Sequence, residues 1–294
     1  MSAKNRGDRI QLLSKVVAKH FTPVPAAEDR SILEHLIYAC CLEDASYEDA
    51  DEAFHRLRES YFDWNEIRVT TVTELRETLH NLRTSDAAAV RIKKNLQSLF
   101  ETRYSFDIDD MAKMNLGKAV QELEKLGGIS KFVLGYVAQH ALGGHSIPVS
   151  KSIMQILLAT EVVTEAEASK DQTPGLERTI PKAKGIAFAS CLHQLAVMAL
   201  NAPDDKLTKT ILKEAGVVLA EAPAKSSTGK KKIAKKAAEK KETPDASTKA
   251  AQRSSTKKSA KADKPSTKKK SATSTKGTSK GAGASKKITK RKPK

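Results

Sequence analysis

Apolar residues recur every three or four positions through most of the first 220 residues of the 294-residue chain. This spacing places them on one face of a helix. The pattern begins in residues 8–20 and resumes in ILEHLIYACCL, residues 32–42, which is apolar on nearly every side and predicts a central, buried helix. No segment shows the alternation that is typical of a half-buried strand. The sequence therefore predicts an all-α fold.

Several further helices are predicted from the same spacing. The segment YEDADEAFHRLRES, residues 47–60, directs its apolar side chains inward and its acids outward. Thr71 and Glu74 have the spacing of a capping box, in which each residue satisfies a free backbone N–H of the other. That box predicts a helix that uses Val72, Leu75, Leu79 and Leu82, and other helices are predicted at about 86–100, 151–163, 186–200 and 204–219.

Three polar or aromatic features each have two interpretations. Trp64, the only tryptophan, is expected in a turn, where it either anchors a loop on the core or stacks on an unpaired base. Arg91, Lys93 and Lys94 cluster on one helix, as a solvated face or as phosphate contacts. The aspartates at 107, 109 and 110 lack the length and glycine of a calcium loop, so capping of the next helix is preferred over metal binding.

A glycine turn between two apolar helices is the most informative motif. It lies in residues 126–150, LGGISKFVLGYVAQHALGGHSIPVS, and the paired helices span about 117–142. Gly127 and Gly128 are expected to reach positive φ at little steric cost. The helix after such a turn presents its N-terminus to the outside, where an anion such as a duplex phosphate is favoured. We therefore predict a helix-hairpin-helix that contacts DNA phosphates through residues 127–131, namely Gly127, Gly128, Ile129, Ser130 and Lys131.

The hairpin resembles the core motif of the endonuclease III (HhH-GPD) superfamily of DNA glycosylases, in which L-P-G-[IV]-G-x-K precedes an apolar helix and a V-D segment. The resemblance covers about residues 30–200 and implies a two-lobed helical domain with Arg91 and Lys94 near the DNA. Alignment on Leu126 and Gly128 puts Phe132 at the position of the catalytic lysine, and Ser150 stands at that of the aspartate.

These two departures bear on chemistry. In the family the lysine forms a Schiff base and the aspartate stabilises charge on the sugar, and neither Phe132 nor Ser150 can replace them. Lys131 points about 100° away from the nucleophile position on a helix. Lys151 is the possible surrogate lysine. His140 and His145 are expected to be ordinary helix-end or loop histidines, since no third ligand or acid completes a site.

The charge of the chain changes abruptly near residue 221. Residues 221–294 hold 25 of the 52 Lys and Arg and 5 of the 35 Asp and Glu, a net of +20, which leaves 27 basic and 30 acidic residues in 1–220. We predict a globular domain at 1–220 and a disordered tail at 221–294, because the tail has too few apolar groups to form a core. It resembles the tails of linker histones and bacterial histone-like proteins. Such a tail binds phosphates without reading sequence, here through lysines such as Lys231, Lys232, Lys268, Lys269 and Lys270.

Cysteine usage and hydropathy set further expectations. Many endonuclease III relatives carry a four-cysteine iron–sulfur cluster, but the three cysteines here are Cys40, Cys41 and Cys191, so no cluster, metal or other cofactor is expected. A disulfide framework is not expected either, which favours a reducing compartment. No run approaches the roughly 20 apolar residues of a membrane span. The expected location is cytoplasmic and nucleoid-associated, or nuclear in a eukaryote.

Three functions remain open. The first is a DNA-binding protein on a glycosylase scaffold that has lost its catalytic pair and binds double-stranded DNA through backbone phosphates. The second is a divergent base-excision repair glycosylase or abasic-site lyase that uses another carboxylate. The third is a histone-like architectural protein whose tail compacts DNA while the folded part docks a protein partner.

Overall fold

The computed structural model describes residues 3–25, 27 and 29–217, which belong to one compact unit. These residues form helices joined by loops, and no strand occurs among them, so the predicted all-α fold is confirmed. The elements are α1 Ala3–His20, α2 Ile32–Leu42, α3 Tyr47–Ser60, α4 Trp64–Val69, α5 Val72–Thr78, α6 Ser85–Arg103, the 3₁₀ helix η1 Asp109–Lys113, α7 Leu116–Glu124, α8 Lys131–His140, α9 Lys151–Ala159, α10 Glu165–Ala168, α11 Leu176–Thr179, α12 Lys182–Asn201 and α13 Lys206–Glu214.

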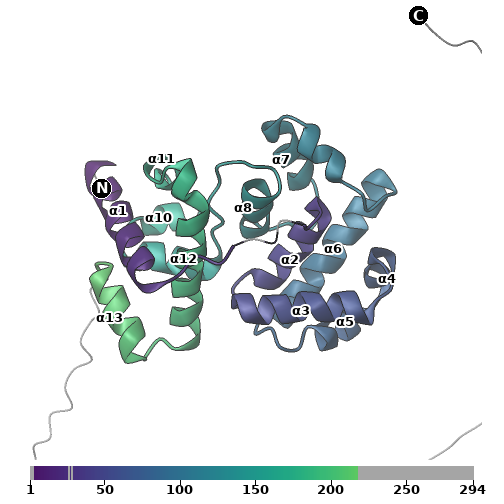
Figure 1. Ribbon diagram of the computed structural model, residues 1–294, viewed down its shortest axis with the longest axis horizontal. Coiled ribbons are helices and arrows are strands. Elements are labelled where there is room, and N and C mark those ends of the chain that lie inside the picture. The colour runs from purple at the N-terminus through teal and green to yellow at the C-terminus, as the bar shows by residue number, and fades with distance from the viewer. Residues whose placement is uncertain (1–2, 26, 28, 218–294) are drawn as a thin grey trace, which may run out of the picture. The chain divides into compact units, whose positions relative to one another are not determined.

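The helices form two lobes. In the first lobe, α2 packs against α3, α6 and α8, α6 packs against α4 and α5, and α7 packs against α8. In the second lobe, α12 packs against α1, α9 and α13. Figure 1 shows the two groups side by side with α8 between them. The chain passes from one lobe to the other twice, after α1 and after α8.

Helix α2 is the centre of the first lobe. Ten of its eleven residues are buried, which confirms the prediction made from its uninterrupted apolar sequence. Its N-terminus is held by a capping box between Ser31 and Glu34. The predicted capping box between Thr71 and Glu74 is also present and begins α5, although α5 ends at Thr78 and Leu79 is its C-cap.

Two local predictions were wrong because the sequence did not show which helix a given side chain caps. Trp64 does not lie in a turn: Asp63 accepts a hydrogen bond from the backbone of Glu66, which starts α4 at Trp64. Asp109 does not cap the first hairpin helix, since Asn115 does so. Asp109 instead accepts a hydrogen bond from the backbone N–H of Ile32 at 2.8 Å and so caps α2.

One helix within the described part of the chain, α12, is long and apolar enough to cross a membrane by length and composition alone. Its mean hydropathy of 1.4 corrects the expectation that no such run exists. Just over half of its apolar window, 56%, is buried inside the protein, where it packs against α1, α9 and α13. This burial is that of a core helix in a globular fold.

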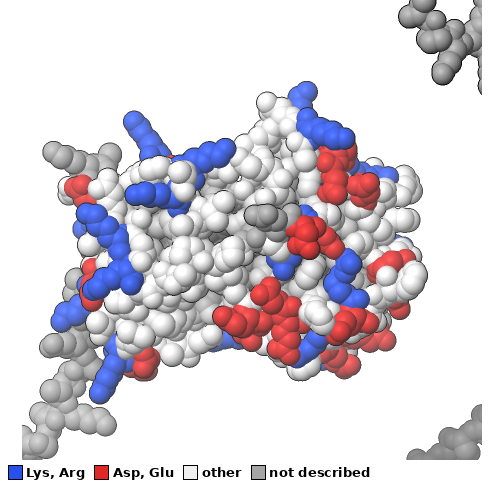
Figure 2. Space-filling view, in the orientation of Figure 1, with Lys and Arg blue, Asp and Glu red and all other residues white. Residues whose placement is uncertain are grey.

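Charge is unevenly distributed over the surface of the folded part. On the face drawn in Figure 2, acidic side chains gather over α3 and α5, and basic side chains lie mainly over α1 and α11. The tail at 221–294 lies outside the described residues, and with it the predicted DNA-binding residues Lys231, Lys232, Lys268, Lys269 and Lys270.

Candidate DNA-binding hairpin and interlobe cleft

The predicted helix-hairpin-helix is formed by α7, a short turn and α8. Of the two turn glycines only Gly128 has a positive φ, of 98°, so the expectation for Gly127 was wrong. A Cβ at Gly128 would lie 2.7 Å from Cβ of Lys94. The turn therefore rests directly on α6, and a glycine is required there both for the backbone conformation and for the close approach.

Exposed lysines surround this turn. Lys94 of α6 lies beneath Gly128, while Lys125 precedes the turn and Lys131 follows it, and all three side chains are exposed. Gly127 is also exposed, and Ile129 is half-buried against the core. The structure thus brings together the predicted hairpin residues and Lys94 in one accessible basic turn.

Arg91, which was also predicted as a DNA contact, does not belong to this exposed set. Its guanidinium turns inward, where it pairs with the carboxylate of Glu43 at 3.3 Å and donates to the carbonyl of Cys40 at 3.3 Å. Its neighbour Lys93 donates to the carbonyls of Arg68 and Thr70 at the end of α4. Both cations therefore hold helices together.

A carboxylate of the protein itself binds the N-cap residue of α8. Ser130 is the N-cap residue and accepts a hydrogen bond from the backbone N–H of Val133 at 3.1 Å. The Ser130 hydroxyl in turn donates to Glu43 Oε2 at 2.6 Å. Burial raises the pKa of Glu43, and the guanidinium of Arg91 opposes that shift.

The N-terminus of α9 is built in the same way. Ser150, which stands where the family has its aspartate, is 3% exposed and accepts a hydrogen bond from the backbone of Ile153. Asp44 accepts hydrogen bonds from both the backbone N–H and the hydroxyl of Ser152. Asp44 thus caps α9 directly, whereas the adjacent Glu43 binds the N-cap residue of α8.

Phe132 is buried among aromatic rings. Its side chain is 2% exposed, and its ring centroid lies 6.4 Å from that of Tyr136 and 5.5 Å from that of His193. Burial lowers the pKa of His193 to about 4. His193 and Tyr136 therefore support the packing of α8 against the second lobe, and Phe132 fills the space between them.

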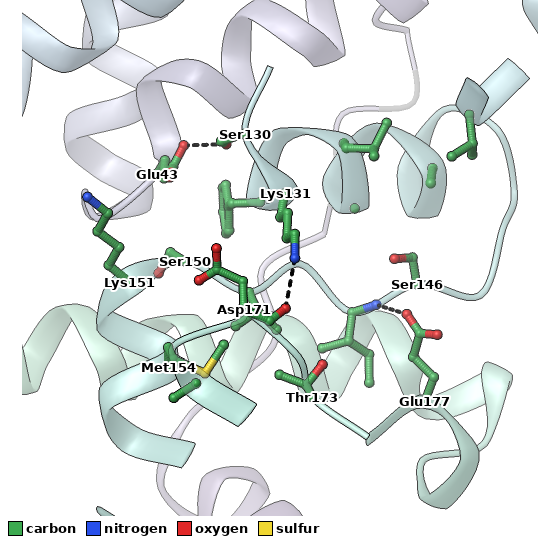
Figure 3. A pocket seen from close by; sticks show the side chains of 18 of the residues that line it. Glu43, Ser130, Lys131, Ser146, Ser150, Lys151, Met154, Asp171, Thr173 and Glu177 are labelled. Atoms are coloured by element: carbon green, nitrogen blue, oxygen red, sulfur yellow. Dashed lines mark hydrogen bonds between the residues drawn. The ribbon is translucent and has the colours of Figure 1, made fainter. Parts of the chain in front are cut away.

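A cleft of about 920 Å³ lies between α7 and α8 on one side and α9 and α10 on the other. The residues at both catalytic positions of the resemblance, Phe132 and Ser150, line it together with Lys151. Figure 3 shows Glu43, Ser150 and Lys151 at one end of the cleft, with Glu43 at the end of α2 and Ser150 and Lys151 at the start of α9. The structure thus brings together the positions that the alignment paired, and it adds Glu43, which sequence reasoning had not assigned.

Lys131 joins the two walls of this cleft. Its amino group, at the start of α8, donates to the carbonyl of Asp171 at 3.0 Å (Figure 3) and to that of Lys170 at 3.4 Å. The segment that it holds follows α10 in the second lobe. Lys131 is therefore both an exposed cation of the hairpin turn and a link between the lobes.

The two predicted histidines serve the fold. His140 is half-buried near the end of α8, and burial lowers its pKa to about 4. The Nε2 of His145 lies 2.8 Å from the carbonyl oxygen of Glu177 and 2.9 Å from that of Ile180. Neither ring has the surroundings of a metal ligand, and no group of three candidate ligands occurs in the described ranges.

The cysteines are also structural. Cys40, Cys41 and Cys191 are buried, free thiols in the structure. Burial raises the pKa of Cys40 to about 12, which keeps it a neutral thiol at physiological pH.

Comparison with known proteins gives likenesses of fold. No family model and no curated protein matches the chain. The solved structures to which it is similar include an endonuclease III–DNA complex (17% identity, 71% of this chain and 96% of that chain, TM-score 0.49) and a thermostable thymine-DNA glycosylase (15%, 72% and 95%, 0.48). Another is the 8-oxoguanine glycosylase/lyase of Clostridium acetobutylicum bound to double-stranded DNA (12%, 69% and 71%, 0.46). With TM-scores below 0.5, these likenesses carry no argument about activity.

Proposed function

We propose that this protein binds double-stranded DNA through backbone phosphates, without cutting it or removing bases. The observation that supports this most directly is the basic hairpin turn, in which Gly128 rests on α6 beside the exposed Lys94. Lys125 and Lys131 flank the same turn. Three lysines around an accessible glycine turn suit a phosphate backbone, because the positive charge of an ammonium group favours an anion.

The tail adds a second DNA-binding part to the proposal. Its net charge of +20 neutralises phosphates and releases counterions, which supplies affinity that does not depend on sequence. Such binding needs no cofactor, and we propose that it occurs on the nucleoid, or in a nucleus if the cell has one.

The packing at the two catalytic positions supports a non-enzymatic role. Phe132 is buried between aromatic rings and carries no nucleophile. Ser150 is buried as the N-cap of α9, so its hydroxyl already has backbone and side-chain partners. Neither residue can stabilise positive charge on a sugar, a task for which a carboxylate is needed.

A second candidate function, base removal, is favoured by one observation. Glu43 lines the cleft with Ser150 and Lys151, so a carboxylate and a lysine lie at the same end of the cleft despite the two substitutions (Figure 3). The ion pair with Arg91 and the hydrogen bond from Ser130 commit this carboxylate to the fold. We therefore rank this function second.

One experiment separates the two functions. The full-length chain is incubated with a duplex that contains one abasic site, with borohydride present to trap a Schiff base, and retention and strand scission are followed together. A parallel assay follows base release from damaged-base duplexes. We expect retention with neither scission, adduct nor released base. Scission or an adduct that disappears in Lys151→Met, or base release that disappears in Glu43→Gln, would establish the second function instead.

The hairpin contact is tested with matched lysine pairs in the full-length chain. The variant Lys94→Gln, Lys131→Gln should lose two phosphate contacts, so that its plot of log affinity against log salt becomes shallower by about 2. The control Lys184→Gln, Lys213→Gln removes two exposed lysines of α12 and α13 and should leave the slope within experimental error. Equal effects of the two pairs would show that the hairpin has no special role.

A further inference from the structure

The interlobe cleft has acidic walls, which a phosphate backbone does not suit. Four exposed carboxylates line it, and within the described part of the chain none of them has an ion-pair partner, namely Glu124, Glu165, Asp171 and Glu177. The amines that line the cleft are those of Lys131 and Lys151, and Lys131 already donates to two carbonyls. A cationic occupant therefore fits this cleft better than a DNA strand.

The floor of the same cleft is aliphatic. It is lined by half-buried side chains from the helices on both sides, including Val120, Leu134, Met154 and Leu158. An aliphatic floor between acidic walls matches a peptide with one branched apolar side chain between lysines, because the apolar group is buried while the ammonium groups meet the carboxylates.

The chain contains such a peptide outside the described residues. The hexad Lys-Lys-Ile-Ala-Lys-Lys occupies positions 231–236, and Lys-Lys-Ile-Thr-Lys-Arg at 286–291 repeats its pattern. Ile233 and Ile288 are the only aliphatic residues larger than alanine between residue 221 and the end of the sequence. In a segment that is otherwise Lys, Ala, Ser, Thr and Pro, each isoleucine is therefore placed between four basic residues.

We propose that the hexad 231–236 docks in the interlobe cleft of its own chain, with Ile233 on the aliphatic floor and its lysines against the four carboxylates. Thirteen residues, 218–230, separate it from position 217, and an extended chain bridges this separation over up to about 50 Å, which is greater than the diameter of a small domain. Because the segment is tethered, its effective concentration is on the order of millimolar and a weak site is filled.

Docking has a consequence for DNA binding that rests on the proposed function. The same lysines that meet the carboxylates would neutralise phosphates, so the cleft and the duplex compete for them. The free protein then holds part of its tail away from DNA, and only a polyanion strong enough to displace the hexad recruits it. If the hexad is docked in between half and nine tenths of the molecules, the apparent affinity for DNA falls by roughly two- to tenfold.

The test is carbodiimide crosslinking of the full-length chain without DNA, which joins amines to carboxylates in direct contact. Mixed isotope-labelled and unlabelled protein distinguishes links within one chain from links between copies. We expect links within one chain from the lysines of 231–236 to the four cleft carboxylates. The variant Ile233→Ser should weaken these links roughly tenfold, since burial of one isoleucine contributes at least that factor. The matched control Ala234→Ser, which keeps the charge and the isoleucine, should not.

Several outcomes would overturn the proposal. Links that form equally to the exposed carboxylates Glu48 and Glu77 of α3 and α5, or that survive Ile233→Ser, would mean diffuse electrostatic attraction. Links only between labelled and unlabelled copies would mean pairing of two chains. Links from the cleft to positions 286–291 alone would mean that this second hexad docks and that 231–236 does not.

Addition of duplex DNA then tests the competition separately. We expect the links to disappear and the Ile233→Ser variant to bind DNA two- to tenfold more tightly than the unchanged chain. Links that persist with DNA bound would leave docking established and refute the competition. Failure of DNA to bind at all would refute the proposed function while the crosslinks still report on docking.

Discussion

At the scale of single residues, Gly128 is the most restrictive position of the hairpin. Its φ of 98° is one that other residues rarely adopt, and an added Cβ would meet Cβ of Lys94 at 2.7 Å. We expect Gly128→Ala to lower the free energy of unfolding by about 1–3 kcal/mol, from backbone strain and the clash together. The measurement is chemical denaturation of the full-length chain followed by far-UV circular dichroism.

The adjacent Gly127 provides the matched control. It has no positive φ, and an added Cβ would meet Cβ of Ser98 at an ordinary 3.8 Å. Gly127→Ala should therefore change the free energy of unfolding by no more than about 1 kcal/mol. Equal losses in the two variants would contradict the assignment of the turn conformation to Gly128 alone.

A buried histidine makes stability depend on pH. Burial holds the pKa of His193 near 4, whereas an unfolded histidine titrates at about 6.5. The unfolded chain therefore binds the extra proton first, so this contribution is complete above pH 6.5 and is lost as the pH falls towards 4. The free energy of unfolding should fall by up to about 1.4 kcal/mol for each pH unit in this range because of this one group.

The variant His193→Gln isolates that contribution. It should reduce the dependence of the free energy of unfolding on pH by about one proton between pH 6.5 and 4, whatever its effect on stability at neutral pH. An unaltered slope in His193→Gln would mean that His193 takes up its proton in the folded protein as readily as in the unfolded one.

At the scale of elements, three helices meet at one buried ion pair. Arg91 of α6 forms an ion pair with Glu43 at the end of α2, and Glu43 accepts a hydrogen bond from the hydroxyl of Ser130 at the start of α8. The two charged side chains are only 18% and 8% exposed. Arg91→Met should lower the free energy of unfolding by about 2–4 kcal/mol, because it leaves a buried carboxylate without its cation.

The neighbouring lysine on α6 should behave in the opposite way. Lys94 is exposed, so Lys94→Gln should change stability by less than about 0.5 kcal/mol but weaken DNA binding. Arg91→Met, measured where it is fully folded, should retain the DNA affinity of the unchanged chain. A loss of DNA affinity in folded Arg91→Met would show that Arg91 does contribute to DNA binding.

A second link between elements is the contact of Lys131 with the segment after α10. Its amino group donates to the carbonyls of Lys170 and Asp171. Removal of these bonds by Lys131→Met should make local opening easier by roughly 1 kcal/mol, so amides of 169–173 should exchange hydrogen about fivefold faster. Lys151→Met is the control, and the same acceleration there would indicate a general loosening of the cleft.

Sequence reasoning was most accurate where the cause is local. The capping box of Thr71 and Glu74 and the burial of α2 follow from residues a few positions apart, and both were predicted. Glu43 was missed because its partner Ser130 lies 87 positions away, and no spacing rule links an acid at the end of one helix to the cap of another. Arg91 was assigned to the surface because its partner, Glu43, is also distant in the sequence.

At the scale of the whole molecule, the cleft shows the same limit. Alignment on the hairpin assigned Phe132 and Ser150 to the two catalytic positions of the resemblance, and both residues line one cleft. The acidic character of that cleft could not be predicted, since its carboxylates come from α7, α10, α11 and a connecting loop that the sequence pattern left as separate pieces. Helix positions were thus predictable from periodicity, whereas the electrostatics of the site depended on the tertiary arrangement.

The division of charge between the folded part and the tail leads to a prediction for salt dependence. Three hairpin lysines should give a truncation at residue 220 a slope of log affinity against log salt of about −3, at 0.9 per phosphate contact. The tail carries 25 basic residues, and engagement of a third of them would steepen the full-length slope to about −10. Circular dichroism of the truncation checks that it is folded before its DNA affinity is measured. A folded truncation that does not bind DNA would leave the tail as the only DNA-binding part, and the hairpin would then serve a protein partner, as in a histone-like architectural protein.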